Sequence, residues 1–340
     1  MDLLNSTDYL LNVSTLIRNS IHIPTSASKM TVVLLLLTSS IIGTITNGFY
    51  LWVLKFKMRK TVNTLLYFHL ILSYFISTLF LPFLAISHLQ DDHWSFGMAT
   101  CKMVYGILYT GMFASVFFLS AISVDRYLLT LHPVWSQLHR TPHWASSIIL
   151  GVWISATALS IPYMVFRETH DDHKGMVTCQ NNYAISTNWE NKKMQTLRQW
   201  IHVACFSSRF LLSFLLPFFI ITFCYERVAK KMKARGLFKS NKPFKVMMTA
   251  IISFFVCWMP YHVYQGLILT KNKSQFFQLT LILTMITISF NTLFSPTLYL
   301  FIGENFRKVF KKSVLNLFEL TFNEDSSTER TQNLNSEGYI

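Results

Sequence analysis

The chain has 340 residues, of which 51% are hydrophobic and only 14% are charged, whereas a typical soluble domain carries about 25% charged residues. This composition disfavours a soluble helical protein, whose helices would keep a polar face, and favours a protein with much of its surface in lipid. The formal net charge is +14, but the basic residues stand in short clusters between apolar stretches, which indicates membrane topology and no nucleic-acid partner.

The N-terminal segment, residues 1–30, precedes the first apolar stretch. It begins MDLLNSTDYLLNVST, without a basic region before an apolar core, so we expect an uncleaved signal anchor in the first span and no cleavable signal peptide. Asn5 and Asn12 begin sequons for N-glycosylation. We therefore predict that this segment is extracellular and glycosylated.

Seven apolar stretches are long enough to cross a hydrocarbon core of roughly 30 Å, which takes about 20 helical residues. They cover residues 31–54, 64–88, 99–130, 145–166, 201–226, 245–269 and 277–301. Because unpaired backbone groups are costly in lipid, all seven are predicted to be helices, with kinks at Pro217 and Pro260. The predicted fold is an all-α membrane protein, a seven-transmembrane helix bundle over residues 31–301.

Clusters of Lys and Arg predict which ends face the cytoplasm. They lie in the first loop, in the third loop, and after the seventh span, so the N-terminus is predicted outside and the C-terminus inside the plasma membrane. Residues 302–318 have an amphipathic pattern typical of a short interfacial eighth helix.

Residues 319–340 are polar and acidic, and we expect a disordered cytoplasmic tail there. The hydroxyl groups of this tail are candidate phosphorylation sites for receptor kinases, which would create negative charge for arrestin to bind. These sites are Ser326, Ser327, Thr328, Thr331 and Ser336. A plain solvated linker is the alternative.

Of the five cysteines, only Cys101 and Cys179 fall in predicted extracellular positions. Cys101 opens the third span and Cys179 lies in the loop before the fifth, so we predict a disulfide between them. Such a bridge would hold the second outer loop over the mouth of the bundle and stabilise it by about 2 to 4 kcal/mol.

The triplet Asp125-Arg126-Tyr127 ends the third span at its cytoplasmic side. Burying either charge alone is costly, so pairing of Asp125 with Arg126 is expected to hold a closed state. Arg126 released from Asp125 could bond main-chain carbonyls or a tyrosine, and a ligand or G protein could bias this choice. A lone triplet fits a merely structural ion pair as well.

Residues along nearly the whole chain accompany the triplet. They are Asn47, Trp94, Trp153, Pro217, Tyr225, Trp258, Pro260, Pro296 and Tyr299. This set resembles the rhodopsin-like (class A) G-protein-coupled receptors. The stretches DRYLLTLHPVWSQLHRT, ARGLFKSNKPFKV and CWMPYH are similar to the chemoattractant branch, which includes formyl-peptide, anaphylatoxin and chemerin receptors.

The resemblance implies a receptor, and no enzyme, for an extracellular peptide or small anionic ligand. It also implies signalling through inhibitory-type heterotrimeric G proteins in immune or inflammatory chemotaxis. Activation and coupling roles are then expected for Asp125, Arg126, Tyr127, Tyr225, Trp258, Pro260, Pro296 and Tyr299. Trp258, above the kink at Pro260, would respond to the ligand, and the sixth span would swing outward near Arg126. A packed aromatic without a switching role is the alternative for Trp258.

Two positions depart from the family pattern. Tyr74 stands where the family usually has a sodium-binding Asp in the second span, and Ser295 replaces the usual Asn or Asp before Pro296. A hard cation at that depth loses its main charge compensation without a carboxylate. We predict no tight sodium site and an unusual resting balance between inactive and active states.

Arg209 is the leading candidate for ligand contact. It lies well inside the fifth span, where an unpaired guanidinium is costly, and the resemblance implies a role toward anionic or C-terminal groups of peptide ligands. An internal ion pair or a snorkelling arginine is the alternative. The other candidates for the ligand pocket are Leu108, Tyr109, Phe113, Tyr261, His262 and Gln265. No cofactor and no metal site are predicted.

Three other classes of protein remain. A decoy or scavenger receptor would bind chemoattractants without productive G-protein coupling, and the intact triplet disfavours it. A transporter or channel would show acidic residues inside the spans or inverted halves. An intramembrane enzyme would need a nucleophile with a base, or a metal constellation, and no suitable set converges.

Overall fold

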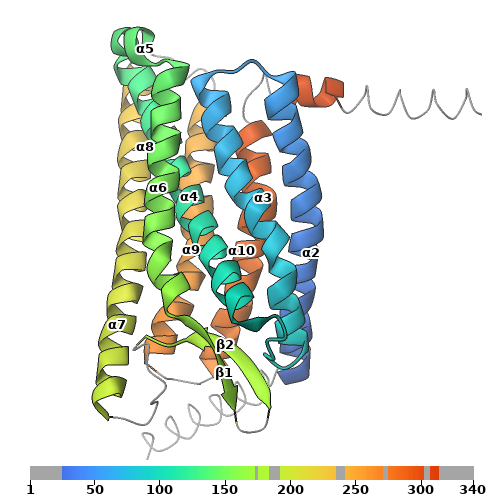
Figure 1. The fold of residues 1–340 in the computed structure, drawn as a ribbon. Coiled ribbons are helices and arrows are strands. Elements are labelled where there is room, and N and C mark those ends of the chain that lie inside the picture. The colour runs from blue at the N-terminus through green and yellow to red at the C-terminus, as the bar shows by residue number, and fades with distance from the viewer. Residues whose placement is uncertain are drawn as a thin grey trace, which may run out of the picture.

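The computed structural model of the chain describes residues 25–172, 175–183, 192–234, 242–270, 275–301 and 307–313, with the side chains at 25–27, 172, 242–251, 275 and 294–301 left aside. Seven helices in this part of the chain are long and apolar enough to cross a membrane. They stand side by side as one bundle (Figure 1). The predicted all-α bundle of seven transmembrane helices is confirmed.

The first four spans are helices with well-defined starting points. They are α2 (Thr25–Trp52), continued by the π-helical turn η1 (Val53–Lys57), then α3 (Val62–Leu89), α4 (Gly97–Leu131) and α6 (Pro142–Val165). Thr61 and Thr141 cap α3 and α6, because the hydroxyl of each accepts from a free N–H in the first helical turn. Between α4 and α6 lies the short helix α5 (Pro133–His139).

The fifth span changes its helical register in the middle. It consists of α7 (Lys192–Phe210), the π-helical turn η2 (Leu211–Leu215) and α8 (Leu216–Ala234). Pro217 is the second residue of α8 and has no N–H for the preceding turn, so the wider π-helical turn just before it accommodates its ring. The sixth and seventh spans, α9 (Lys242–Leu269) and α10 (Gln275–Phe301), are each a single helix, and α9 continues through Pro260.

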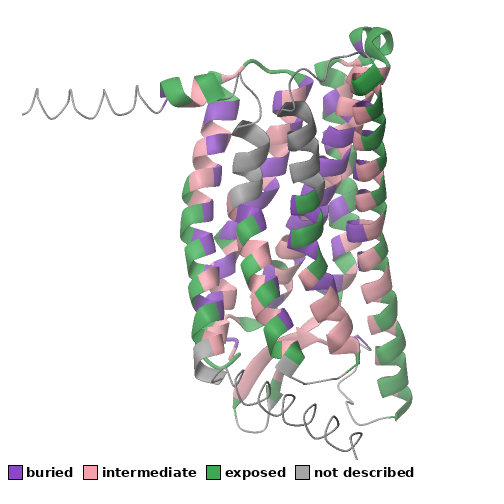
Figure 2. Cartoon of the chain, turned by 180° about the vertical axis from the view of Figure 1, so that it is seen from behind, coloured by how far each residue is buried: buried purple, intermediate pink, exposed green. Residues whose placement is uncertain are grey.

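Burial separates the inner and outer faces of the bundle. Buried residues point toward the centre, whereas large apolar residues such as Ile45, Leu150 and Phe219 are exposed on the outside (Figure 2). In water such a surface would be unfavourable, and in a bilayer it meets hydrocarbon. Residues 307–313 form a further short helix beside the end of α2, where Phe310 packs against Phe49 at a ring-centroid distance of 5.4 Å (Figure 1).

A β-hairpin lies across one end of the bundle, which we call the hairpin end (Figure 1). Strands β1 (Arg167–Asp172) and β2 (Met176–Asn181) pair antiparallel, with Thr169 opposite Cys179. The predicted disulfide is confirmed, because Cys179 is bonded to Cys101 in the first turns of α4. The backbone N–H of Trp94 also donates to the Val177 carbonyl at 2.7 Å, so two loops and α4 are joined over the bundle.

Candidate ligand pocket and coupling site

Arg209 lies inside the bundle, one residue before the end of α7, with only 2% of its surface exposed. Its Nη1 donates to the Tyr109 hydroxyl at 3.0 Å, and its Nη2 donates to Oε1 of Gln265 at 2.9 Å. These contacts join the third, fifth and sixth spans through one guanidinium. Its Nε has no hydrogen-bond partner among the described residues.

Aromatic rings enclose the Arg209 guanidinium. Its central carbon lies 5.6 Å from the Tyr109 ring centroid, 5.2 Å from that of Tyr163 and 5.4 Å from that of Tyr261. Within the described part of the chain, no carboxylate pairs with Arg209. Neutral rings and hydroxyls favour a cation through cation–π and hydrogen-bond contacts, but they do not neutralise its charge.

His262 is a second buried polar group of the pocket without a described hydrogen-bond partner. It is 2% exposed, and neither ring nitrogen is hydrogen-bonded within the described residues. Its ring packs 5.4 Å from the Phe210 ring and 5.0 Å from the Phe214 ring. The side chains around Arg209 are mostly aromatic, and a guanidinium and an imidazole among them keep spare hydrogen-bonding capacity within the described residues.

The remaining pocket candidates fall into two places. Tyr109, Tyr261 and Gln265 contact Arg209, as described, and Phe113 is buried with its ring 6.3 Å from that of Tyr163. Leu108 packs elsewhere, with Leu84, with apolar residues of α2, and with apolar residues of the loop between α3 and α4. Neighbouring residues on a helix point in different directions, so Leu108 and Tyr109 face different spaces.

Sequence reasoning missed Tyr163 and Tyr183 around Arg209, and a second arginine, Arg167, at the hairpin end. Tyr163 stacks on Tyr109 at 4.2 Å and donates its hydroxyl to the Cys205 carbonyl at 2.7 Å. Arg167, directly after α6, lies with its guanidinium carbon 3.3 Å from the Tyr105 ring centroid. Tyr183, in the segment after β2, lies close enough to both arginines for an electrostatic effect, although burial is the larger influence and raises the pKa of Tyr183. The only sequence signal for these residues was a charged residue directly after the fourth span.

At the other end of the bundle, the expected ion pair between Asp125 and Arg126 is wrong in this structure. Asp125 is 1% exposed and accepts two hydrogen bonds from Arg140, from Nε at 2.6 Å and from Nη2 at 3.0 Å. Arg126 donates to Oδ1 of Asn63 on α3. The short helix α5 brings both N–H groups of the Arg140 guanidinium onto the two carboxylate oxygens of Asp125, the planar geometry that an arginine and a carboxylate prefer.

The other residues of the predicted switch occupy separate positions between the two ends. Tyr127 packs 6.0 Å from Phe223 of α8, and Tyr225 is a partly buried member of the main hydrophobic cluster near Arg126. Trp258 is buried, with its ring 6.2 Å from that of Tyr261. An aromatic contact therefore connects the Arg209 pocket to Trp258.

Several residues with a predicted role lie outside the described part of the chain, or their side chains do. These are Asn5, Asn12, Pro296, Tyr299, Ser326, Ser327, Thr328, Thr331 and Ser336.

Tyr74 stands at mid-depth of α3 and is buried in the main hydrophobic cluster with Phe113 and Trp258. Its hydroxyl is near Ser115 and Asn291, yet makes no hydrogen bond of normal geometry among the described residues. A phenol ring thus fills the position where the sequence comparison with class A receptors leads one to expect a sodium-binding carboxylate.

Comparisons with known proteins agree with this arrangement. Residues 46–299 match the family of 7 transmembrane receptors (rhodopsin family). The chain is similar to probable G-protein coupled receptor 33 of Pan paniscus, with 76% identity over 98% of this chain and 100% of that protein. It is 67% identical to probable G-protein coupled receptor 33 of Mus musculus over the full length of both. Similarity extends to chemerin-like receptor 1 of Mus musculus, with 39% identity over 84% of this chain and 78% of that protein.

Proposed function

The chain belongs to the rhodopsin family of seven-transmembrane receptors, a family of multi-pass membrane receptors and not enzymes, and we propose that it is a chemoattractant-type receptor for a peptide or small anionic ligand. Signal transfer to inhibitory-type G proteins, in immune or inflammatory chemotaxis, completes the proposal. Its relationship to chemerin-like receptor 1 supports the chemoattractant branch.

The proposal of an anionic ligand rests on one observation, the uncompensated positive charge of Arg209 among the described residues. The guanidinium is 2% exposed, has an unused Nε donor, and lacks a carboxylate partner among the described residues. A ligand carboxylate would supply the missing charge and accept hydrogen bonds in the planar geometry that a guanidinium prefers. The aromatic walls would bury the apolar part of a C-terminal residue or of a small organic acid.

The proposed topology places the hairpin end outside the cell and the Asp125 end in the cytoplasm, in agreement with the Lys and Arg clusters of the loops. A ligand on Arg209 would then act through Tyr261 on Trp258, whose rings are 6.2 Å apart. G protein, receptor kinases and arrestin would bind at the cytoplasmic end, where Arg126 lies and where the hydroxyl-rich tail is expected. The N-terminal segment would carry glycans at Asn5 and Asn12.

The test compares peptide pairs that differ only at the C-terminus, as free acid or amide, on cells expressing the receptor, with second-messenger readout. We expect active peptides to lose potency on amidation, and Arg209→Gln to lose the acid preference by about 10- to 100-fold, because a hydrogen bond to a charged group contributes about 1.5 to 3 kcal/mol. Arg209→Lys keeps the positive charge but loses the planar set of N–H donors that a guanidinium has. This variant would therefore respond to the acid more weakly than the native receptor.

Arg198→Gln is the matched control, since Arg198 is on the same helix and donates to Asn182 at the hairpin end. Equal responses of the native receptor and Arg209→Gln to the acid would refute the role of Arg209. Binding of the acid without ligand-stimulated nucleotide exchange would instead indicate a decoy receptor.

A further inference from the structure

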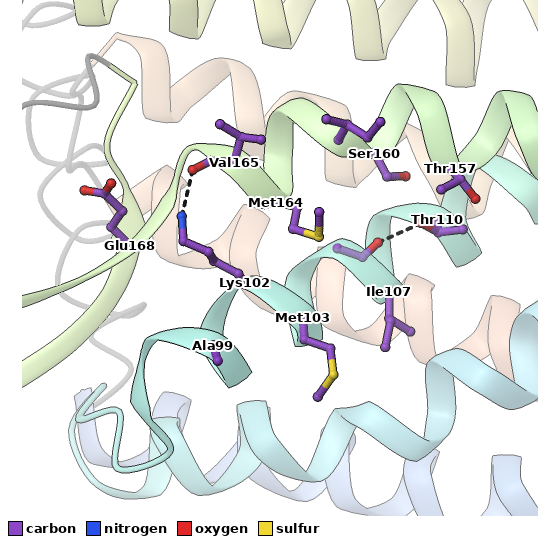
Figure 3. A pocket seen from close by; sticks show the side chains of 12 residues that line it. Ala99, Lys102, Met103, Ile107, Thr110, Thr157, Ser160, Met164, Val165 and Glu168 are labelled. Atoms are coloured by element: carbon purple, nitrogen blue, oxygen red, sulfur yellow. Dashed lines mark hydrogen bonds between the residues drawn. The ribbon is translucent and has the colours of Figure 1, made fainter.

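A groove separate from the Arg209 pocket lies between α4 and α6 at the hairpin end. Its volume is about 650 Å³, and its walls are largely apolar, from Met103 and Ile107 on α4 and Ile161 and Met164 on α6 (Figure 3). Most ligand pockets have volumes of about 300 to 1,000 Å³, so this groove is large enough for an organic molecule. The three tyrosines whose rings surround Arg209 are not among its lining residues, so the groove is separate from the surroundings of Arg209.

The length of the groove matches one leaflet of a bilayer. Its α4 wall runs from Ala99 to Thr110, which corresponds to roughly 16 Å of helix at 1.5 Å per residue. Half of a hydrocarbon core is about 15 Å. Several wall residues, among them Met103, Ile161 and Met164, are exposed on the outer surface of the bundle. The groove is therefore open to lipid chains along its length.

A small residue gives the groove its depth. A Cβ atom added to Gly106 would lie 3.2 to 3.3 Å from atoms of the Met164 side chain, so a larger residue would push Met164 outward into the groove. With glycine at 106, α4 and α6 approach closely, and the flexible Met164 side chain packs over Gly106 as part of the groove wall. Such a wall adapts to a chain of variable shape.

The mouth of the groove carries two opposite charges. Lys102 on α4 and Glu168 on β1 both line the groove toward the hairpin (Figure 3). Lys102 donates to the Val165 carbonyl at 2.9 Å, and Glu168 accepts from Nδ2 of Asn182 at 2.7 Å. The two do not form an ion pair with each other within the described residues. An ammonium has three donors and a carboxylate has about four acceptor sites, so both retain free capacity.

We propose that this groove binds one acyl chain of a zwitterionic phospholipid, with the lipid phosphate on Lys102 and the lipid ammonium group on Glu168. Only a headgroup with both charges satisfies both side chains, because an anionic headgroup would be repelled by Glu168 and a cationic one by Lys102. Under the proposed topology the lipid belongs to the outer leaflet. The site itself does not depend on which ligand Arg209 binds.

The experiment is native mass spectrometry of the full-length receptor, released from bilayers that contain equal amounts of phosphatidylcholine and phosphatidylglycerol. The native receptor is expected to retain phosphatidylcholine in preference. Glu168→Gln is expected to reduce that preference by about tenfold, because it removes the Coulomb attraction between the carboxylate and the choline cation, which has no N–H to donate. Lys102→Gln is expected to reduce retention of both lipids.

A blocking variant tests the apolar part of the site. Thr157→Trp places an indole on the α6 wall, whereas the matched control Leu150→Trp places one on the exposed lipid face of the same helix, outside the groove. Retention of phosphatidylcholine should fall in the first variant and stay unchanged in the second. Equal retention of the two lipids by the native receptor, or equal behaviour of the two Trp variants, would overturn the proposal.

The lipid experiment can be interpreted even if one variant is unstable or if the proposed role of Arg209 is wrong. If Thr157→Trp lowers the melting temperature, the change in headgroup preference in Glu168→Gln decides the question alone. Because lipid retention is measured without peptide or G protein, its outcome is separate from that of the Arg209 experiment.

Discussion

Replacing Arg140 with Gln removes the cation that holds Asp125, whose carboxylate is 1% exposed and accepts from Arg140 at 2.6 and 3.0 Å. Breaking a buried ion pair by removing one partner costs about 3 to 5 kcal/mol. Arg140 keeps 18% of its side chain exposed, and Arg126 is available nearby as a substitute partner, so part of this loss is recovered. We expect a net loss of about 2 to 3 kcal/mol and a melting temperature lower by several degrees.

The same change is expected to lower nucleotide exchange. In the structure, Arg126 is free of Asp125 because Arg140 occupies both carboxylate oxygens, and Arg126 instead donates to Asn63. Without Arg140, we expect Arg126, the next residue along α4, to pair with Asp125, and this pairing would withdraw Arg126 from the site proposed for the G protein. The assay is ligand-independent nucleotide exchange on an inhibitory-type G protein in membranes with matched receptor amounts.

A double variant distinguishes this account from simple misfolding. Asp125→Asn removes the acid that would trap Arg126, so Arg140→Gln should have little further effect on exchange in that background. If Arg140→Gln raises exchange, or if the effects of the two substitutions simply add, Arg140 does not act through Asp125 and Arg126. Arg140→Lys keeps the positive charge but loses the paired N–H donors of the guanidinium. Its rate of nucleotide exchange is expected to lie between those of the native receptor and Arg140→Gln.

Three further expectations concern the hairpin end and the middle of the bundle. Cys101→Ser, which opens the bond to Cys179, is expected to destabilise the receptor by about 2 to 5 kcal/mol, measured as a lower melting temperature. Because Tyr74 fills the depth at which related receptors bind sodium, radioligand affinity is expected to be the same in sodium and in potassium buffers. The hydrogen bond from His88, at 2.7 Å, lowers the pKa of Asp92, so its contribution to stability is present above the ordinary aspartate pKa and is lost as the pH falls through the lowered value. The melting temperatures of the native receptor and Asp92→Asn should therefore differ near neutral pH, and the difference should shrink only as the pH falls below the ordinary aspartate pKa of about 4 toward the lowered value.

Each of these expectations has an opposite result. An unchanged melting temperature in Cys101→Ser would show that the hairpin holds its place without the bond. A shift of radioligand affinity with sodium would show that polar groups around Tyr74 still bind the ion. A difference between the native receptor and Asp92→Asn that does not shrink as the pH falls below about 4 would mean that the Asp92 carboxylate does not stabilise the protein through its charge.

The sequence by itself determined the architecture of this protein. Apolar length, loop charge and turn positions are local properties, so the seven spans, and the bond between Cys101 and Cys179, could be predicted without coordinates. Arg209 could be singled out for the same reason, because a lone cation inside an apolar span is visible in the chain itself.

Only the tertiary structure decided which side chains meet. The partner of Asp125 is Arg140 and not the adjacent Arg126, and Tyr163 stacks on Tyr109 while Leu108 turns away from Arg209. These outcomes depend on how helices far apart in the sequence rotate and approach each other. A guanidinium binds the carboxylate that it can reach with both of its N–H groups, and reach is a property of the packed bundle rather than of neighbouring positions in the chain.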